Sequence, residues 1–153
     1  MGNILRLIST FGNSAWEFLF NNEDSNPFFS SDYPIAIEKS SDPRTMNKIF
    51  PLSPKMAIRI IPDTSLRSGN SDLSFSKFRY LRKSLKDTEA SKINKMIVQC
   101  AEDLVFFSEK WDWTAEFIAK NRNFRIEPST QKIPRANGYF NYSTQSIAEI
   151  VRD

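Results

Sequence analysis

Three residue types are absent or scarce in this chain of 153 residues: histidine is missing, and there are only one cysteine and four glycines. Without histidine, a Ser-His-Asp triad, a Cys-His pair and an imidazole-ligated metal site are excluded. A single cysteine excludes an internal disulfide and a thiolate zinc cluster. Four scattered glycines cannot form a phosphate-binding loop or a dinucleotide fingerprint. We therefore expect no cofactor and no bound metal.

The rest of the composition is typical of a folded globular domain. Hydrophobic residues make up 40% of the chain and charged residues 25%, and its thirteen phenylalanines exceed what a disordered chain carries. The apolar segment between Ile4 and Phe20 is interrupted by Arg6 and Glu17, so it is too polar for a membrane span or a signal peptide. Cys100 lies in an apolar pattern, which indicates a reduced thiol. We expect a cytoplasmic protein with no membrane partner.

The spacing of apolar residues predicts the elements of the first half of the chain. Ile4–Phe20 follows helical spacing and is expected as two short helices, separated near Gly12. Phe28–Ile37 is predicted as a strand at an edge or with a bulge, because Pro34 cannot donate a backbone hydrogen bond. Lys55–Ile61 alternates in the manner of a strand with one buried face.

The second half is predicted to alternate between helices and short strands. Leu73–Lys86 has apolar residues at helical spacing, and a stronger helix is expected to follow, with Asp87 or Thr88 as its N-cap and an apolar stripe that reaches Leu104. Beyond it we expect a strand at Val105–Ser108, a short helix at Trp111–Lys120, a strand at Phe124–Glu127, a polar connector at Pro128–Asn137 and a small helix that begins at Ser143.

These elements predict an α+β fold, in which a small mixed sheet of three to four short strands packs against three to four helices. We expect a single domain over residues 1–121 and a C-terminal extension over residues 122–153 that docks on it. The extension contains an aromatic cluster at Tyr139–Tyr142. This cluster could cover the domain or bind a second copy, so a homodimer is one arrangement that we consider.

Three short motifs follow one another in an informative order. Pro27–Pro34 resembles an F-I-T-S-D-x-P strand and turn, and Phe50–Ala57 resembles a P-L-S-P-x-x-A strand entry. Ile93–Ser108 resembles a helix that begins I-N and runs into V-x-S. Together, these motifs resemble the C-terminal half of the domain of unknown function 4238 family over roughly residues 16 to 108. The motif residues carried by this chain are Ser31, Asp32, Pro34, Ser53 and Asn94.

The resemblance implies an intracellular protein of a family whose members are usually longer, with a helical N-terminal half that opens near a histidine. This chain shows no counterpart of that half and has no histidine. The resemblance therefore supplies a fold expectation but no activity. A truncated member could act as an accessory protein, or as an inhibitor that competes with a longer relative for its partner.

The Ser31-Asp32 turn before Pro34 admits two interpretations. In the first, Asp32 and Glu38 bind a divalent cation and act in a nuclease-like hydrolase. In the second, Asp32 accepts hydrogen bonds from backbone N–H groups and fixes the turn, which we favour because aspartate is common there. Asn94, at the edge of the apolar stripe of its helix, either reaches across to this turn or lies exposed at the boundary.

Lysine and arginine are unevenly distributed along the chain. Residues 77–95 and 120–135 are net positive, whereas residues 96–119 between them are net negative. We expect a basic helix face that binds nucleic acid or an acidic protein, rather than a catalytic site. The candidate binding residues are Lys77, Arg79, Arg82, Lys83, Lys86, Arg122 and Arg125, with Lys132 and Arg135 as further basic positions.

Overall fold

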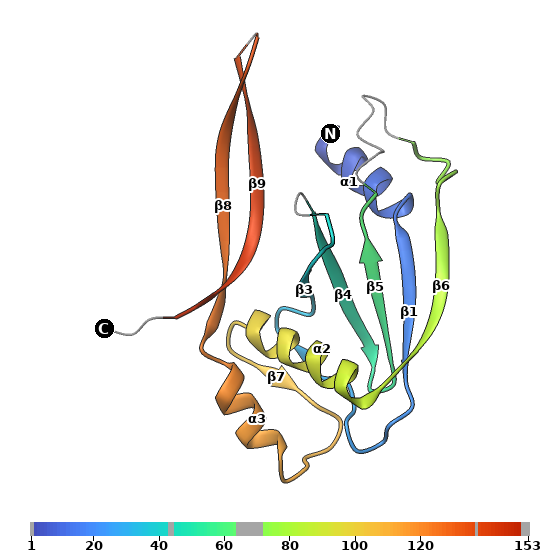
Figure 1. Cartoon of the computed structure of the whole chain (residues 1–153), viewed down its shortest axis with the longest axis vertical. Helices are drawn as coiled ribbons and strands as arrows, with labels where there is room; N and C mark the ends of the chain where they lie inside the picture. The colour runs from blue at the N-terminus through green and yellow to red at the C-terminus, as the bar shows by residue number, and fades with distance from the viewer. Residues whose placement is uncertain (1, 43–44, 64–71, 137, 151–153) are drawn as a thin grey trace.

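A five-stranded sheet organises the first half of the chain. The computed structural model describes residues 2–42, 45–63, 72–136 and 138–150. The strands of the sheet are β1 (Ala15–Asn21), β3 (Ala36–Lys39), β4 (Met46–Ser53), β5 (Met56–Ile61) and β6 (Arg79–Leu85). Their order is β3-β4-β5-β1-β6, and neighbouring strands are antiparallel except for β1 and β6, which are parallel (Figure 1).

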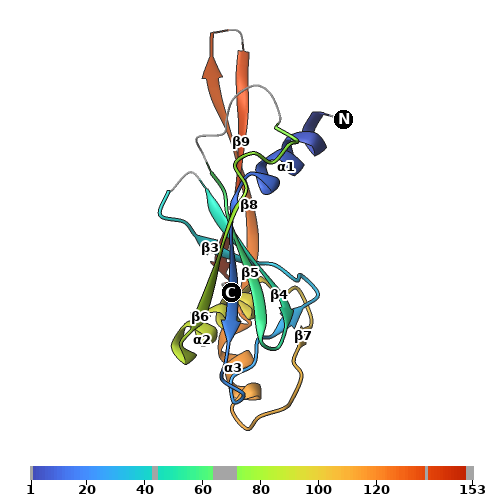
Figure 2. The same ribbon diagram turned by 90° about the vertical axis from the view of Figure 1, so that its right-hand side faces the viewer.

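Three helices and two smaller sheets complete the described part of the chain. The helices are α1 (Gly2–Gly12), α2 (Asp87–Cys100) and α3 (Thr114–Asn121). The smaller sheets pair β2 (Ser30–Ser31) with β7 (Val105–Phe106), and β8 (Phe124–Arg135) with β9 (Gly138–Glu149). The β8–β9 hairpin extends well beyond the end of the main sheet (Figure 2). None of the helices described is long and apolar enough to cross a membrane.

The α+β class is confirmed, but the fold contains more strands than expected. Nine strands in three sheets are described, where three to four strands were predicted. Part of the difference arises in three segments, in each of which a predicted helix or connector is a strand. The rest comes from β4, which was not predicted as a strand, and from the division of one predicted strand into β2 and β3. The division of the chain at residue 121 stays a prediction.

The segment after Gly12 is a strand, where a second helix was expected. α1 ends at Gly12, and β1 starts at Ala15. β1 lies between β5 and β6, and side chains on both of its faces are at least half-buried. Apolar residues therefore occur at consecutive positions, and this pattern is compatible with helical spacing. Its aromatic residues Trp16, Phe18 and Phe20 nevertheless recur at strand spacing.

The helix predicted over Leu73–Lys86 is also wrong, because β6 occupies residues 79–85. β6 pairs in parallel with β1, from Ala15↔Arg79 to Asn21↔Leu85. Leu81, which helical spacing places in the core, is 63% exposed. Pairing with β1 thus overrides a local pattern that fits a helix.

The predicted connector at 128–137 and the predicted helix from Ser143 both lie in the β8–β9 hairpin. The two strands pair from Phe124↔Glu149 to Arg135↔Gly138. Gly138 adopts a φ of 135°, which a residue with a side chain rarely adopts. Polar residues occupy both faces over much of the hairpin, so its strands lack the apolar alternation by which a strand is recognised.

The remaining predictions agree more closely with the structure. The predicted helix is α2, but its N-cap is Lys86 instead of Asp87 or Thr88, and it ends at Cys100 instead of Leu104. The Glu89 carboxylate accepts the Lys86 N–H at 3.1 Å. β5, β7 and α3 overlap the segments predicted for them, and the strand predicted over Phe124–Glu127 is the start of β8. The strand predicted over Phe28–Ile37 is divided into β2 and β3, which lie on either side of Pro34.

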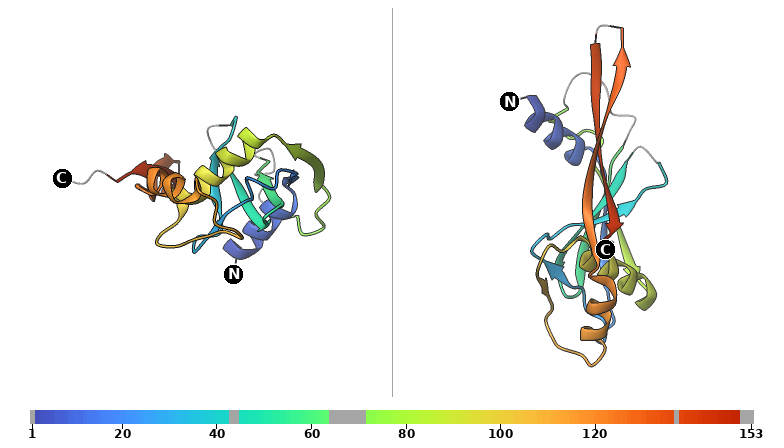
Figure 3. Two further views of the ribbon diagram at one scale, coloured as in Figure 1. Left: turned by 90° about the horizontal axis from the view of Figure 1, so that it is seen from below. Right: turned by 90° about the vertical axis from the view of Figure 1, so that its left-hand side faces the viewer.

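The main sheet has one covered and one open face. On the covered face, Ile93 and Ile97 of α2 belong to the same buried cluster as Leu19, Ile49 and Ala57, and each of these residues is at most 1% exposed. α1 lies on the opposite side of the sheet from α2 (Figure 3). Most of the apolar burial therefore lies between the sheet and α2.

A buried amide network ties α2 to the loop that follows β1. Asn94 is fully buried, and its Oδ1 accepts the Phe29 N–H at 2.9 Å while its Nδ2 donates to the Pro27 carbonyl at 2.8 Å. The neighbouring Asn26 donates to the first turn of α2. Of the two expectations for Asn94, the contact across the chain is correct, although it is made with residues just before the Ser31-Asp32 turn.

Replacing Asn94 by alanine is expected to lower the free energy of unfolding by about 3 kcal/mol, because it leaves the buried Phe29 N–H and Pro27 carbonyl without partners. Urea denaturation measures this change. Asn22→Ala, at an exposed position in the same loop, should stay within about 0.5 kcal/mol of wild type. Equal losses in the two variants would contradict the role of the network.

Candidate functional site

The Asp32 carboxylate holds the loop that follows α2. Its Oδ1 accepts the N–H groups of Tyr33 and Glu102, both at 3.0 Å. Its Oδ2 accepts those of Asp103 at 2.7 Å and Leu104 at 3.0 Å. These four backbone donors confirm the structural interpretation of Asp32.

The same contacts favour the ionised form of Asp32. Desolvation raises the pKa of the carboxyl, but the four backbone N–H groups outweigh it and lower the pKa below its ordinary value. A carboxylate engaged in this way has few lone pairs left for a cation. Asp32 is therefore suited to positioning the loop.

Glu38 belongs to a separate ion cluster on the covered face. Arg59 on β5 donates to the Glu38 Oε1 at 2.9 Å and to the Glu17 Oε2 at 2.7 Å. Asn47 donates to the other oxygen of Glu38 at 2.9 Å. The described residues contain no group of three or more His, Cys, Asp or Glu side chains arranged to hold a metal ion. The joint catalytic interpretation of Asp32 and Glu38 thus gains no support from the geometry.

The other motif residues shape turns between strands. The Ser31 hydroxyl donates to the Tyr33 carbonyl at 2.6 Å, and Pro34 separates β2 from β3. At the β4–β5 turn, the Ser53 hydroxyl accepts the Lys55 N–H at 3.3 Å. Together with Asn94, these residues have structural contacts that account for their positions.

The basic residues around β6 do not share one side, contrary to the helix prediction. Side chains alternate along the strand, so Arg79 and Lys83 belong to the side that α2 covers, and Arg82 belongs to the open side. Lys86 follows β6 and is the N-cap of α2, whereas Lys77 comes two residues before β6 begins. The basic helix face is therefore replaced by a basic edge strand.

Arg122 and Arg125 do not join the β6 residues. Arg122 follows α3, and Arg125 lies at the start of the hairpin. The hairpin stands beside β3, whereas β6 is at the opposite edge of the main sheet (Figure 1). Arg125 is also paired with Glu127 at 2.7 Å. The two positive stretches of the sequence therefore lie on different sides of the molecule.

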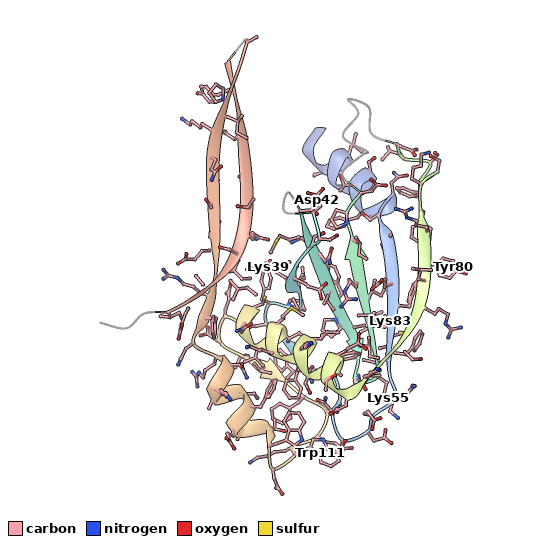
Figure 4. The ribbon with its side chains drawn as sticks, in the orientation of Figure 1. Lys39, Asp42, Lys55, Tyr80, Lys83 and Trp111 are labelled. Carbon is pink, nitrogen blue, oxygen red and sulfur yellow. The ribbon has the colours of Figure 1, made fainter. Side chains whose placement is uncertain are left out.

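The open side of the sheet carries a cluster that sequence reasoning missed. We call it the aromatic face, and it consists of Trp16, Phe18, Phe20, Phe78, Tyr80 and Arg82. The sequence does contain a pattern that indicates this face, because its residues from β1 and from the β6 segment occur at every second position. The helices predicted for both segments concealed this alternation. Tyr80 projects outward from β6 (Figure 4).

Ring contacts fix the geometry of the aromatic face. Phe78 stacks on Tyr80 with centroids 6.4 Å apart, and Phe18 meets Tyr80 edge-on at 6.0 Å. The guanidinium carbon of Arg82 lies 4.9 Å from the ring centroid of Phe20. Tyr80 remains 62% exposed despite its two ring neighbours. The cluster is thus ordered yet open.

The strand carboxylates of the main sheet lie on one side only, whereas its cations lie on both. According to the strand registers, Lys39, Lys48 and Arg82 lie on the side of the aromatic face. Glu17 and Glu38 lie on the side covered by α2. Among the described strand residues of this sheet, the open side carries no carboxylate. This side is therefore positive, although the chain as a whole has a charge of only +3.

Asp32→Asn is expected to flatten the decrease of stability at low pH. Because the folded-state pKa of Asp32 is lowered, its stabilising effect is complete above the unfolded-state pKa and is lost as pH falls through the folded-state pKa. Between about pH 5 and pH 2, wild type should therefore lose more stability than the variant, as measured by urea denaturation at each pH. Asn22→Ala, which removes no titratable group, should retain the wild-type profile, and parallel profiles for wild type and Asp32→Asn would refute this role.

Comparison with known proteins identifies a family but no activity. A family model described as a protein of unknown function (DUF4238) matches residues 1–111. The matched segment contains the five-stranded sheet, α2 and the Asp32 turn, and the β8–β9 hairpin lies outside it. No curated protein and no solved structure matches the chain. The chain therefore belongs to the DUF4238 family of proteins of unknown function.

Proposed function

We propose that the protein binds single-stranded nucleic acid on the aromatic face. The observation that carries the proposal is the Arg82 guanidinium over the ring of Phe20, beside the exposed Tyr80, on a side of the sheet without strand carboxylates. The proposal keeps the partner predicted from the sequence. It replaces the basic helix by a sheet face with a basic edge strand.

The exposed rings suit the bases of an unpaired strand. A base stacks on an aromatic side chain whatever its identity, because every base has a π-face. Tyr80 offers an exposed ring, and Phe18 and Phe78 hold it in place. Arg82 adds a planar cation that can stack on a base or pair with a phosphate. Duplex nucleic acid would not offer its bases to such a surface.

The edge strand supplies cations for the phosphates. Lys77 and Lys86 are exposed at the two ends of β6. The Arg79 side chain is 69% exposed, and its nearest contact to Asp63 is a long 3.7 Å. Lys83, by contrast, is paired with Glu89 at 2.8 Å. Lys77 and Lys86 can therefore contact a phosphate backbone at the two ends of the strand, and Arg79 can reach it around the sheet edge from the opposite side.

An apolar groove continues the aromatic face toward α1. It encloses about 380 Å³ and is lined by Phe11, Trp16, Phe50, Leu52, Ile58 and Ile60. Because Trp16 belongs to both surfaces, a strand bound on the aromatic face could place an unstacked base in the groove. The groove thus extends the binding surface across the sheet from the basic edge.

The geometry supports the other predicted functions less well. An acidic protein would use the same cations but would give the exposed Tyr80 ring no particular role. A hydrolase would need Asp32 and Glu38 to leave the partners that they already have. Inhibition of a longer relative and homodimer formation stay predictions. Nucleic acid is the partner for which both the rings and the cations have a use.

Tyr80→Ala is expected to weaken binding of a fluorescent single-stranded oligonucleotide about ten-fold, because base stacking on an aromatic ring contributes about 1–3 kcal/mol. Arg82→Met should weaken it to a similar degree, since it removes a stacking cation. Fluorescence anisotropy measures both. Wild-type affinity should also fall as salt rises from about 50 mM to about 200 mM.

Tyr139→Ala is the matched control, since Tyr139 is 66% exposed on the hairpin, away from the aromatic face. It should bind the oligonucleotide as wild type does. Equal affinity of the Tyr80 and Tyr139 variants, or equal binding of a duplex of the same length, would show that stacking has no part. Absence of binding by the wild-type protein at low salt would refute nucleic acid as the partner.

A further inference from the structure

A second cleft lies between the main sheet and the hairpin, remote from β6. It encloses about 780 Å³ and is lined by Lys39, Ser40, Thr45, Met46, Lys48, Pro128, Thr130, Ser143, Thr144, Gln145 and Ser146. Figure 4 labels Lys39 on the side of β3 that faces the hairpin. The cleft is thus formed by two segments far apart in the sequence.

The cleft is cationic and carries no carboxylate among its described lining residues. Lys48 donates to the Gln145 Oε1 at 3.2 Å, and this acceptor is a neutral amide. Partial burial lowers the pKa of Lys48, because desolvation disfavours its charged form. The ammonium group is therefore only partly compensated, and an anion in the cleft would stabilise its charge.

Hydroxyl groups account for most of the polar lining. Six of the lining residues are serine or threonine. Two of them, Thr130 and Ser143, face each other across the hairpin with their hydroxyl oxygens 3.0 Å apart. Each hydroxyl can donate or accept a hydrogen bond, so the cleft suits a ligand that itself carries several hydroxyls. None of the described lining residues is aromatic, which disfavours a ligand that depends on ring stacking.

We propose that this cleft binds a small phosphorylated polyhydroxy compound of the sugar phosphate class. Lys39 and Lys48 would bind the phosphate, and the serine and threonine hydroxyls with the Gln145 amide would bind the sugar hydroxyls. The site lies at the β3 edge and the aromatic face at the β6 edge, so this inference does not depend on nucleic-acid binding.

Isothermal titration of the full chain with glucose 6-phosphate, glucose and inorganic phosphate tests the proposal. Glucose 6-phosphate should bind at least ten-fold more tightly than either of the others, because it alone uses both halves of the cleft. Lys48→Met should weaken its binding about ten-fold, the effect of about 1.4 kcal/mol from one lost charge contact. Lys39→Met, at a more exposed position, should weaken it in the same direction and keeps the test valid if the Lys48 variant does not fold.

Lys55→Met is the matched control, because Lys55 lies in the β4–β5 turn outside the cleft. It should bind glucose 6-phosphate as wild type does, and so should Tyr80→Ala, whatever its effect on oligonucleotide binding. Equal binding of inorganic phosphate and glucose 6-phosphate, unchanged in both cleft variants, would mean an adventitious ion only and would overturn the proposal. Lack of glucose 6-phosphate binding by wild type up to about 10 mM would also overturn it.

Discussion

The parallel pairing of β6 with β1 fixes which side chains meet on each side of the main sheet. Parallel neighbours cannot be joined by a tight turn, and the chain between these two strands includes β3, β4 and β5. The register Phe18↔Arg82 places Arg82 beside the rings of β1. A slip by one residue would exchange Tyr80 and Arg82 for Arg79, Leu81 and Lys83, and the aromatic face would not exist. The register is held at one end by Leu85, which is only 7% exposed and reaches the core beneath α2.

α2 therefore does more than cover the sheet. It starts directly after β6, so packing of α2 on the core also sets the position of the edge strand. Its buried Asn94 holds the loop after β1, and Asp32 in turn holds the loop after α2. These polar contacts connect strands and loops in a chain that has a single cysteine. The residues that resemble family motifs thus maintain the scaffold, and both proposed binding surfaces consist largely of other residues.

The sequence predicts those elements whose pattern is settled locally. α2 has an unbroken apolar stripe and an acidic first turn, and its N-cap, Lys86, lies next to the predicted Asp87 or Thr88. β1 and β6 were misassigned because pairing with other strands decides their structure, and that partner information is not local. Of the hairpin, only Phe124–Glu127 was predicted as a strand, because beyond it the two strands are polar on both faces over much of their length. The turn role of Asp32 could be predicted from its place before Pro34, but its three donors in the loop after α2 lie about seventy residues further along the chain. The aromatic face could not be predicted without the correct structure of both its strands.

The arrangement of charge, more than its total, favours binding over catalysis. On the covered side, Glu17 and Glu38 both form ion pairs with Arg59, so both acidic groups of the sheet already have a cationic partner. On the open side, the cations have no strand carboxylate beside them: Arg82 lies over the Phe20 ring, and Lys48 donates to the neutral amide of Gln145. Acid–base chemistry requires a carboxylate or similar group that is free to exchange a proton, whereas anion recognition requires uncompensated cations at fixed positions. This arrangement of cations supports the two binding surfaces that we propose. A chain with little net charge can therefore offer the two surfaces that we propose, because cations lie on both sides of its main sheet whereas both strand carboxylates lie on the covered side.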